Sequence, residues 1–445
     1  MRTTLSTSDA VWQHPLAQHV QRGLGRFSPE QRFVVACSGG RDSLVLADLL
    51  AHLAPDRVRL LHVNHQLHPD ATQWTQQVHT WAMRRGLACQ VCPVQVADGN
   101  LESQARQARY QAFMQHVQPD EVLVLAHHQQ DQAETLLMRL FSGSGVQGLS
   151  AMRTDDQRGG LHLWRPLLQC ARLWIEQFIV LRELAVIDDP ANQEAQYDRV
   201  YLRQSVWPIL QQRWPSVERT IARTAELMQD AAEVLAEVTA QDLKMCQTPQ
   251  GLSVLAVQQL SAARQRQLIA TWLRGDALYA PPRHRVLAVL QLIEANSTGQ
   301  VRWHNWHIRC YQGQLYRLHA QIEPHQPEVV RLPSLQIGQQ IRLRSGIWQV
   351  QPAMDGLSLD LLTQRLCLMP RMGGERLHIE GRIGRWPLKK FLQHLNLPTW
   401  QRDQVQLLQA DAPDAEPLAV LTPQGCFLTA PSVQDQQPSW RLQRV

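Results

Sequence analysis

The chain has 445 residues, a length that allows about three domains. With 44% hydrophobic and 19% charged residues, its composition excludes both a disordered chain and a coiled coil. Lys and Arg number 44 against 39 Asp and Glu, and the resulting net charge of +5 is too small to establish a nucleic-acid partner on its own.

Cysteine content and hydropathy indicate the cellular compartment in which the protein works. The 8 Cys are scattered along the chain, far fewer than a secreted disulfide scaffold would carry. No apolar run reaches about 18 residues, and the N-terminal stretch lacks the apolar core of a signal peptide. We therefore expect a cytoplasmic protein that does not span a membrane.

Four short apolar runs in the first third of the chain predict strands, at 33–37, 58–63, 89–94 and 121–127. Stretches with helical periodicity separate them, and this alternation is typical of an α/β domain with a parallel sheet. A fifth run at 161–168 is a candidate for another strand. In such sheets the ligand lies outside the carboxyl ends of the strands, so the residues just after each run are the candidates for a site.

The rest of the chain has a different pattern of apolar and polar residues. Residues 217–243 form one amphipathic helical pattern, and 302–319 predicts two antiparallel strands. The segment 322–334 contains three Pro and is typical of a linker, and short strands with one helix near 388–395 follow it. We predict an α/β domain at 1–215, a mostly helical middle domain at 216–325 and a small α+β C-terminal domain at 333–445.

The strongest segment is Ser-Gly-Gly-Arg-Asp-Ser at 38–43, between the first run and a helical pattern. Its two Gly let the backbone approach an anion, which the following helix N-terminus stabilises. Its two Ser can donate hydrogen bonds to phosphate oxygens, and Asp42 makes sense if it holds Mg²⁺ beside them. The alternative is a Gly-rich turn capped by Ser and Asp. The segment matches neither a Walker A loop nor the GxGxxG turn.

This segment resembles the PP-loop of the ATP-pyrophosphatase family, whose pattern is SGGxDS. Those enzymes have the adenine nucleotide α-hydrolase fold, cleave ATP between its α- and β-phosphates and adenylate a substrate oxygen. The family includes sulfur-inserting tRNA enzymes and amide-forming synthetases, so the loop leaves the substrate open. The resemblance implies that ATP is bound by Ser38, Gly39, Gly40, Arg41, Asp42 and Ser43.

His62, Asn64 and His65 follow the second run and are expected to point at the ligand crevice. A metal site is one interpretation and loop capping the other, which we favour because no carboxylate or third ligand lies near in sequence. The stretch resembles HVNHGLR of the tRNA(Ile)-lysidine synthetases, with Gln66 in place of Gly and His68 in place of Arg. That family uses the region at its nucleotide site, which implies that His62 and Asn64 bind ATP.

Glu102, Arg106 and Arg109 lie on nearly the same face of a predicted helix. A surface ion pair with a solvated Arg would explain them and would contribute little. The spacing E-x-x-A-R-x-x-R-Y is similar to the lysidine synthetase pattern, which implies a functional Arg pair. Arg suits a polyanion such as ATP or the leaving pyrophosphate, and Arg106 is therefore a candidate catalytic residue.

The fourth run ends in two His, and Asp131 and Glu134 on the following helix place both carboxylates on one side. An N-cap role would explain Asp131 but not Glu134. The stretch resembles AHHxDDQxET of the lysidine synthetases, except that Gln130 replaces the first Asp of the pair. If that position binds metal in the family, this protein must rely on Asp42 and Asp131 for Mg²⁺.

A further block resembles D-x-S-N…Y-x-R-N-x-I-R of the same family. The matching residues are Asp189, Asn192, Tyr197, Arg199 and Arg203. The resemblance implies that they order a loop that closes the site, and a structural helix entry is the equally weighted alternative.

A basic patch marks the C-terminal segment. Between Arg365 and Arg402, eight Lys and Arg oppose two Glu, and this +6 exceeds the +5 of the whole chain. Such a patch with Trp interleaved fits a phosphate-backbone partner, and an ordinary solvated face is the alternative. The segment resembles the lysidine synthetase C-terminal domain, which recognises tRNA. The resemblance implies tRNA contacts from Arg371, Arg376, Lys389, Lys390 and Arg402.

These motifs occur in the family's order over nearly the whole chain, which is identified as a member of the tRNA(Ile)-lysidine synthetase family. Membership implies a ligase that uses ATP and Mg²⁺ and adenylates the C2 oxygen of the wobble cytidine in tRNA(Ile) with a CAU anticodon. The ε-amine of L-lysine then displaces AMP and leaves lysidine. A lysine substrate carries two ammonium groups, for which Asp131 and Glu134 are the candidate ligands. The attacking amine must lose a proton, and His128 is the proposed base.

Two alternatives stay open. A tRNA thiolase of the same superfamily would need a reactive Cys near the loop, and Cys37, Cys89 and Cys92 are the candidates. A non-catalytic tRNA-binding protein would have a degenerate loop, against which the intact segment 38–43 argues. The sequence leaves the oligomeric state open, with a homodimer as one candidate.

Overall fold

The computed structural model describes residues 11–97, 101–188, 198–275, 277, 280–295, 299–319, 329–379, 384–412, 415–429 and 434–445. The chain separates into two compact units, Met1–Val238 and Thr239–Val445. The three-domain division made from the sequence stays a prediction.

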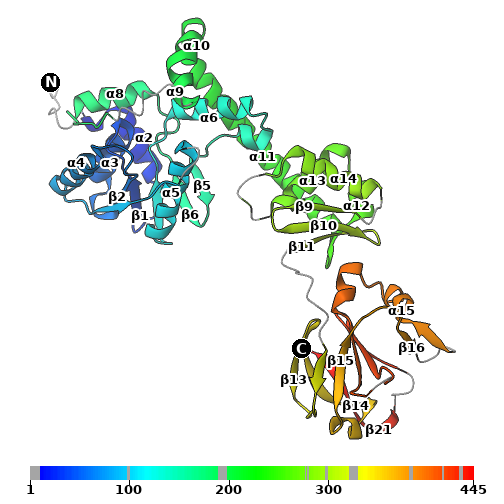
Figure 1. Ribbon diagram of the computed structural model, residues 1–445. Helices are drawn as coiled ribbons and strands as arrows, with labels where there is room; N and C mark the ends of the chain where they lie inside the picture. The colour runs from blue at the N-terminus through cyan, green and yellow to red at the C-terminus, as the bar shows by residue number, and fades with distance from the viewer. Residues whose placement is uncertain are drawn as a thin grey trace, which may run out of the picture. The chain divides into compact units, whose positions relative to one another are not determined.

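A six-stranded sheet with the order β3-β2-β1-β4-β6-β5 forms the centre of the first unit (Figure 1). Its strands are β1 (Arg32–Ala36), β2 (Val58–Asn64), β3 (Cys89–Pro93), β4 (Glu121–Val124), β5 (Asp155–Arg158) and β6 (Leu161–Trp164). All neighbours are parallel except β5, which pairs with β6 as an antiparallel edge hairpin. The predicted α/β class and all five predicted strands are confirmed.

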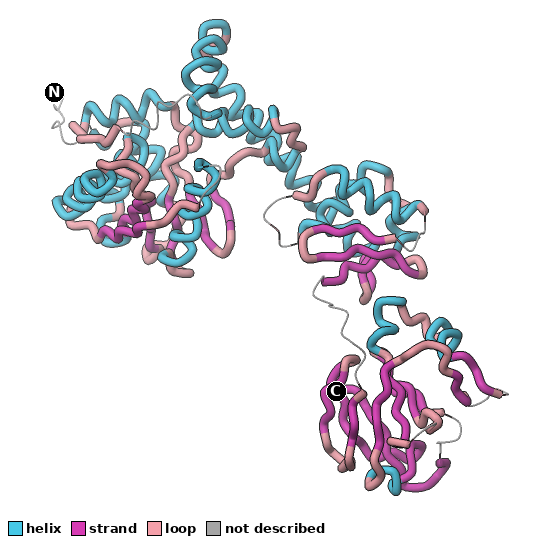
Figure 2. Tube along the Cα trace, viewed as in Figure 1, coloured by secondary structure: helices cyan, strands magenta, loops and turns pink. Residues whose placement is uncertain are grey.

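Helices lie on both sides of these strands (Figure 2). They are α2 (Pro15–Leu24), α3 (Arg41–Leu53), α4 (Ala71–Arg84), α5 (Leu101–His116), α6 (Gln129–Phe141), α7 (Val146–Leu149) and α8 (Arg172–Leu181). After them come α9 (Asp198–Tyr201), the π-helical turn η3 (Leu202–Val206), α10 (Trp207–Arg213) and α11 (Val217–Cys246).

Burial on both faces explains why these strands are continuous apolar runs. Phe33 and Val35 of β1 pack into one core with α2, α3, α4 and α8, whereas Val34 between them packs into a second core with Phe113 of α5. Successive strand residues point to opposite faces, so both sets must be apolar. The strand order changes direction between β1 and β4, and this is where a ligand crevice is expected.

The second unit begins with a sheet of order β7-β8-β11-β10-β9. Its strands are β7 (Gln247–Thr248), β8 (Gly251–Ser253), β9 (Gln300–Trp303), β10 (Trp306–Tyr311) and β11 (Gln314–His319), and its helices are α12 (Val254–Gln258), α13 (Ala262–Arg274) and α14 (Arg283–Glu294). The predicted strand pair is confirmed as β10 and β11. The other strands are too short for a periodicity to predict them.

The remaining residues are mostly strands, and the short helix α15 (Leu388–His394) lies beside them (Figure 2). They form β12 (Val330–Leu332), β13 (Gln340–Leu343), β14 (Gly346–Ser358), β15 (Leu366–Pro370), β16 (Arg376–His378), β17 (Arg385–Pro387), α15 (Leu388–His394), the 3-10 turn η5 (Thr399–Gln404), β18 (Gln406–Ala410), β19 (Ala419–Thr422), β20 (Gly425–Leu428) and β21 (Gln434–Arg444).

Part of the predicted linker is wrong. Residues 322–328 lie outside the described ranges, but β12 falls inside the predicted linker and pairs antiparallel with β15. The Pro content hid this strand because Leu332, its buried end, stands directly before Pro333. Within the described ranges, no helix has the length and apolarity needed to cross a membrane.

Candidate active site

Residues 38–43 join β1 to α3, and hydrogen bonds between the two serines fix their shape. The Ser43 hydroxyl accepts from the Ser38 amide at 3.1 Å and donates to the Gly40 carbonyl at 3.0 Å. The Ser38 hydroxyl accepts from the Gly40 amide at 3.3 Å. Gly40 is the N-cap residue of α3 and has no side chain to occupy the first helical amides. These amides are therefore suited to bind an anion.

Gly39 is required by both conformation and space. Its φ of +86° lies in the left-handed region, where residues with a Cβ are strained. A Cβ at this position would stand 2.4 Å from Ile187 Cδ1 and 2.8 Å from Val78 Cγ2. The Ile187 amide also donates to the Gly39 carbonyl at 3.0 Å. The segment that follows α8 thus packs directly against the loop.

Arg41 of the loop forms an ion pair with the segment that follows α8. Its guanidinium binds both carboxylate oxygens of Asp188, at 3.2 and 3.3 Å. Both side chains are exposed. The pair ties the first turn of α3 to the residue at which the described range ends.

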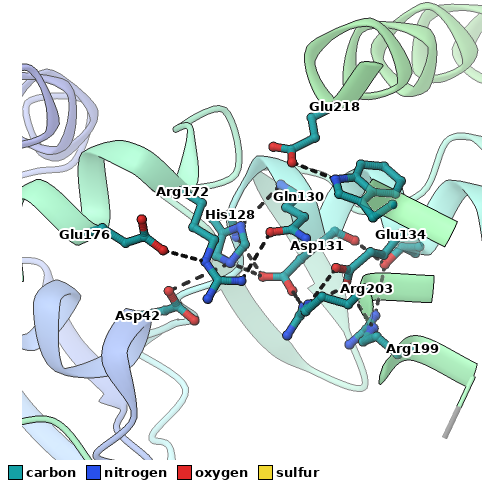
Figure 3. Close-up of polar contacts among 12 residues, drawn as sticks. Asp42, His128, Gln130, Asp131, Glu134, Arg172, Glu176, Arg199, Arg203 and Glu218 are labelled. Carbon is teal, nitrogen blue, oxygen red and sulfur yellow. Dashed lines mark hydrogen bonds and ion pairs between the residues drawn. The ribbon is translucent and has the colours of Figure 1, made fainter. Parts of the chain in front are cut away.

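His128, the N-cap residue of α6, lies between the two carboxylates predicted to hold Mg²⁺ (Figure 3). Its Nε2 stands 3.8 Å from Asp42 Oδ1 and 3.5 Å from Asp131 Oδ2. Its Nδ1 accepts from the Gln130 amide at 3.2 Å, so the neutral ring carries its proton on Nε2, facing the carboxylates. The ring then has no free lone pair, which argues against the predicted role of His128 as a base and favours a role in orienting carboxylates.

Asp131 completes a capping box with His128. Its Oδ2 accepts from the His128 amide at 3.0 Å, and its side chain is nearly buried. Burial by itself would raise the pKa of Asp131, but His128, His127 and Arg199 together lower it to about 2. The predicted capping role is therefore correct in part, because Asp131 both caps α6 and carries a fixed negative charge.

Arg203 of η3 binds the carboxylate pair from the other side. It donates to both oxygens of Glu134, at 2.9 and 2.8 Å, and to Asp131 Oδ1 at 3.3 Å. Arg199 Nε lies 3.7 Å from Glu134, whose side chain has no exposed surface. Burial raises the pKa of Glu134, and Arg203 opposes that rise. The two carboxylates thus lie on one side of α6, as the sequence indicates, but Arg203 already binds both of them, and their role as lysine ligands stays a prediction.

Asp42 is the more accessible carboxylate, with 41% of its side chain exposed. Burial of its surroundings raises its pKa, and His128 opposes that rise. Within the described ranges, no group of three or more His, Cys, Asp and Glu could hold a metal. Mg²⁺ bound with phosphates needs only one or two protein carboxylates. Asp42 fits that requirement better than Asp131, whose two oxygens already have partners.

His62 and Asn64 sit at the end of β2 and are joined through Thr75 of α4. His62 Nδ1 lies 2.8 Å from the Cys37 carbonyl and its Nε2 lies 3.1 Å from the Thr75 hydroxyl. The Asn64 amide donates to the same hydroxyl at 3.0 Å. Burial lowers the pKa of His62. Of the two predicted ATP ligands, His62 thus contacts the backbone that leads into the phosphate loop, and Asn64 is linked to it through Thr75.

The predicted Arg pair lies on α5. Arg106 stacks over the Tyr110 ring at 5.2 Å from its centroid. Arg109 acts on His65: burial, and then Arg109, lower the pKa of His65 to about 4. The side chain of Glu102, their predicted ion-pair partner, lies outside the described residues, as do Asp189, Asn192 and Tyr197.

The five predicted tRNA contacts differ in exposure. Arg376, Lys389 and Lys390 are exposed and Arg371 is half-buried, whereas Arg402 is buried. Arg402 donates to the Leu397 carbonyl at 2.9 Å and to the Tyr311 hydroxyl at 3.4 Å. The prediction that Arg402 belongs to an exposed basic patch does not agree with this buried position. Its guanidinium instead donates hydrogen bonds within the second unit.

Sequence reasoning missed Thr75 and Arg172. Thr75 gave no signal of its own, since a single Thr in a helical pattern is ordinary. Arg172 stands at the start of α8, eight residues after β6 ends, and its Nη1 donates to Gln130 at 3.4 Å. Arg172 lies too far beyond the predicted strand at 161–168 to count among the residues that directly follow it, so the rule on strand ends did not indicate it.

Three family models match the chain: a PP-loop domain over residues 12–210, a TilS substrate binding domain over 252–316 and a TilS substrate C-terminal domain over 366–442. The tRNA(Ile)-lysidine synthase of Acinetobacter baylyi is 41% identical over 439 residues, covering 97% of this chain and 95% of that protein. The tRNA(Ile)-lysidine synthase of Alkalilimnicola ehrlichii is 35% identical over 398 residues, covering 87% and 89%. A solved structure, the U34-tRNA thiolase NcsA from Methanococcus maripaludis, aligns with a TM-score of 0.42 and 17% identity over 50% of this chain and 80% of that one.

Proposed function

The chain belongs to the tRNA(Ile)-lysidine synthase family, and we propose that it ligates L-lysine to the wobble cytidine of tRNA(Ile) with a CAU anticodon, using ATP, in the cytoplasm. The observation that carries the proposal is the juxtaposition of the phosphate loop 38–43 with the charged cluster at the start of α6. Asp42 of the loop and Asp131 of the cluster face the same His128 ring (Figure 3).

In the first step the C2 oxygen of the cytidine attacks the α-phosphorus of ATP, and pyrophosphate leaves. The first amides of α3 and the hydroxyls of Ser38 and Ser43 stabilise the charge that develops on the leaving group. Asp42 would hold Mg²⁺, which supplies further positive charge there. Arg106 and Arg109 add positive charge from α5.

In the second step the ε-amine of lysine attacks C2, and AMP leaves. Asp131 and Glu134 supply the negative charge that an ammonium group requires, and lysine shares this charge with Arg203. Desolvation in this partly buried site lowers the pKa of the amine, whereas the two carboxylates raise it, so the amine must give its proton to solvent before it attacks C2. The exposed basic residues Arg376, Lys389 and Lys390, with Arg371, contact the tRNA backbone.

The thiolase alternative is disfavoured. Burial raises the pKa of the Cys37 thiol to about 11, the opposite of what a nucleophilic Cys needs. Cys92 is also buried, and burial raises its pKa as well.

Incubation with ATP, Mg²⁺, labelled lysine and a CAU tRNA(Ile) transcript, followed by digestion to nucleosides, tests the proposal. Label on cytidine that requires ATP and is absent with initiator-methionine tRNA is expected. AMP release without label would indicate another nucleophile, and sulfur donors would be tried next. Neither AMP nor label would contradict a catalytic role. Light scattering of the same sample tests the homodimer that the sequence leaves open.

A further inference from the structure

Arg172, the first residue of α8, places its guanidinium at the mouth of the phosphate loop. Its Nε donates to Glu176 at 3.0 Å and its Nη1 donates to Gln130 Oε1 at 3.4 Å. Figure 3 shows this guanidinium among Glu176, Gln130 and Asp42. In the part of the chain that the structure describes, Nη2 has no hydrogen-bond partner. The contacts that Arg172 makes within α8 therefore do not account for the position of its guanidinium next to the loop.

Gln130 is a neutral and buried partner for this cation. Its side chain is only 5% exposed, and its backbone amide is held by His128. The corresponding position of the family motif is Asp, which would form an ion pair with Arg172 and cancel its charge. Gln130 keeps the oxygen that orients the guanidinium and leaves the positive charge available.

The other arginines at the loop are already engaged. Arg41 binds Asp188 through two nitrogens, and Arg203 binds Glu134 in the same way. The Arg172–Glu176 pair is an exposed i, i+4 contact, which is the weakest type of ion pair. Arg172 is therefore the guanidinium at the loop that can most easily exchange its present partner for a phosphate.

We propose that Arg172 binds the β- and γ-phosphates of ATP, and hence the departing pyrophosphate, and that Gln130 is the residue that positions it. The inference rests on the proposed function, because it takes ATP to be bound at 38–43. Arg is suited to this task because its planar fork donates two parallel hydrogen bonds to phosphate oxygens. The buried Gln130 oxygen holds Nη1, and release of Glu176 from Nε opens the edge formed by Nε and Nη2 for the ligand.

Calorimetric binding of three ligands to the full chain tests the proposal: α,β-methylene-ATP, which cannot be cleaved at the reacting bond, AMP and inorganic pyrophosphate. We expect Arg172→Ala to weaken binding of the triphosphate and of pyrophosphate about tenfold and to leave the AMP affinity unchanged. Arg172→Lys should recover part of the loss. Gln130→Glu keeps Arg172 but neutralises it, and should also weaken the two polyphosphate ligands selectively.

Glu176→Gln is the matched control, because it removes the other partner of Arg172 and should leave triphosphate affinity equal or higher. Equal weakening of AMP and triphosphate, or no weakening in Arg172→Ala, would overturn the proposal and leave Arg172 as a residue that only supports α8. Thermal unfolding of each variant identifies any that fail to fold, and Gln130→Glu then decides. Wild-type chain that binds the triphosphate selectively through Arg172 but forms no lysidine would contradict the proposed function alone.

Discussion

Arg203 donates hydrogen bonds to both oxygens of the Glu134 carboxylate, at 2.9 and 2.8 Å, although the two residues are 69 positions apart in the chain. Glu134 has no exposed surface, whereas 31% of the Arg203 side chain is exposed. A buried carboxylate without a partner is costly, so this contact both stabilises the first unit and sets the charge of the site. If the proposed function is correct, lysine binding and folding depend on the same carboxylate.

Arg203→Ala should lower the free energy of unfolding by about 2–3 kcal/mol, less than is typical of a fully buried pair because Arg203 reaches solvent. Chemical denaturation measures this loss. The control is the double variant Arg203→Met with Glu134→Leu, which removes both charges and should recover most of the stability. Equal stability of Arg203→Ala and wild type would show that Glu134 is protonated in the folded protein.

Glu134→Gln keeps the shape of the side chain, removes its charge and retains one of the two hydrogen bonds from Arg203, so it disturbs folding less than a truncation would. We expect a several-fold higher KM for lysine with little change in the KM for ATP, since the lysine ammonium, like Arg203, loses a charged partner, whereas the ATP phosphates bind at residues 38–43. Steady-state kinetics with each substrate varied in turn measure both constants. Unchanged lysine dependence would remove Glu134 from the lysine pocket.

Much of the frame could be predicted from the sequence, because it depends on local patterns. The runs around Phe33 and Val122 are apolar on both faces, which fixed them as central strands, and the residue types at 38–43 were enough to indicate an anion loop. The pairing of Arg203 with Glu134 could not be derived in this way. This ion pair joins two segments that only tertiary packing brings together. An Arg or a Glu in a sequence does not indicate which residue it will pair with.

Arg402 and His128 show the same limit for single residues. The number of basic residues placed Arg402 in the tRNA patch, but its burial depends on Leu397 and Tyr311 packing around it. The role of base assigned to His128 depended on which ring nitrogen is free. That follows from the N-cap geometry of α6, which a periodicity does not reveal.

Asp42→Asn should abolish adenylation while the protein stays folded. The carboxylate is partly exposed and lies in the first turn of α3, so its replacement removes the candidate Mg²⁺ ligand without leaving a buried charge unpaired. Release of AMP in the presence of the CAU tRNA measures the effect, and far-ultraviolet circular dichroism checks the fold. Retained turnover in this variant would exclude Asp42 as a metal ligand.

His65 should make the protein acid-sensitive. Its Nδ1 is buried with no partner among the described residues, and burial lowers its pKa to about 4 from an ordinary 6.5. Between these values the unfolded chain binds a proton that the folded protein does not. The stability due to neutral His65 is therefore complete above pH 6.5 and is lost as the pH falls toward 4.

The test compares His65→Gln with wild type by urea denaturation at about pH 7 and about pH 5. Wild type should lose about 1–2 kcal/mol more than the variant over this interval. Identical pH dependence in the two proteins would mean that the pKa of His65 is the same in the folded and unfolded states.

Lys389 and Lys390 should behave differently from Arg402, because the two Lys are exposed and Arg402 is buried. Replacing each Lys by Ala should weaken tRNA binding and reduce the slope of log K against log salt concentration by about 1 for every phosphate that is no longer neutralised. Arg402→Ala should leave that slope unchanged and instead lower the free energy of unfolding by about 1–3 kcal/mol, because the Leu397 carbonyl and the Tyr311 hydroxyl lose their donor. Filter binding of the tRNA transcript across a salt series, with denaturation of the same samples, separates the two effects. A slope reduced by Arg402→Ala as much as by Lys389→Ala would return Arg402 to the tRNA surface.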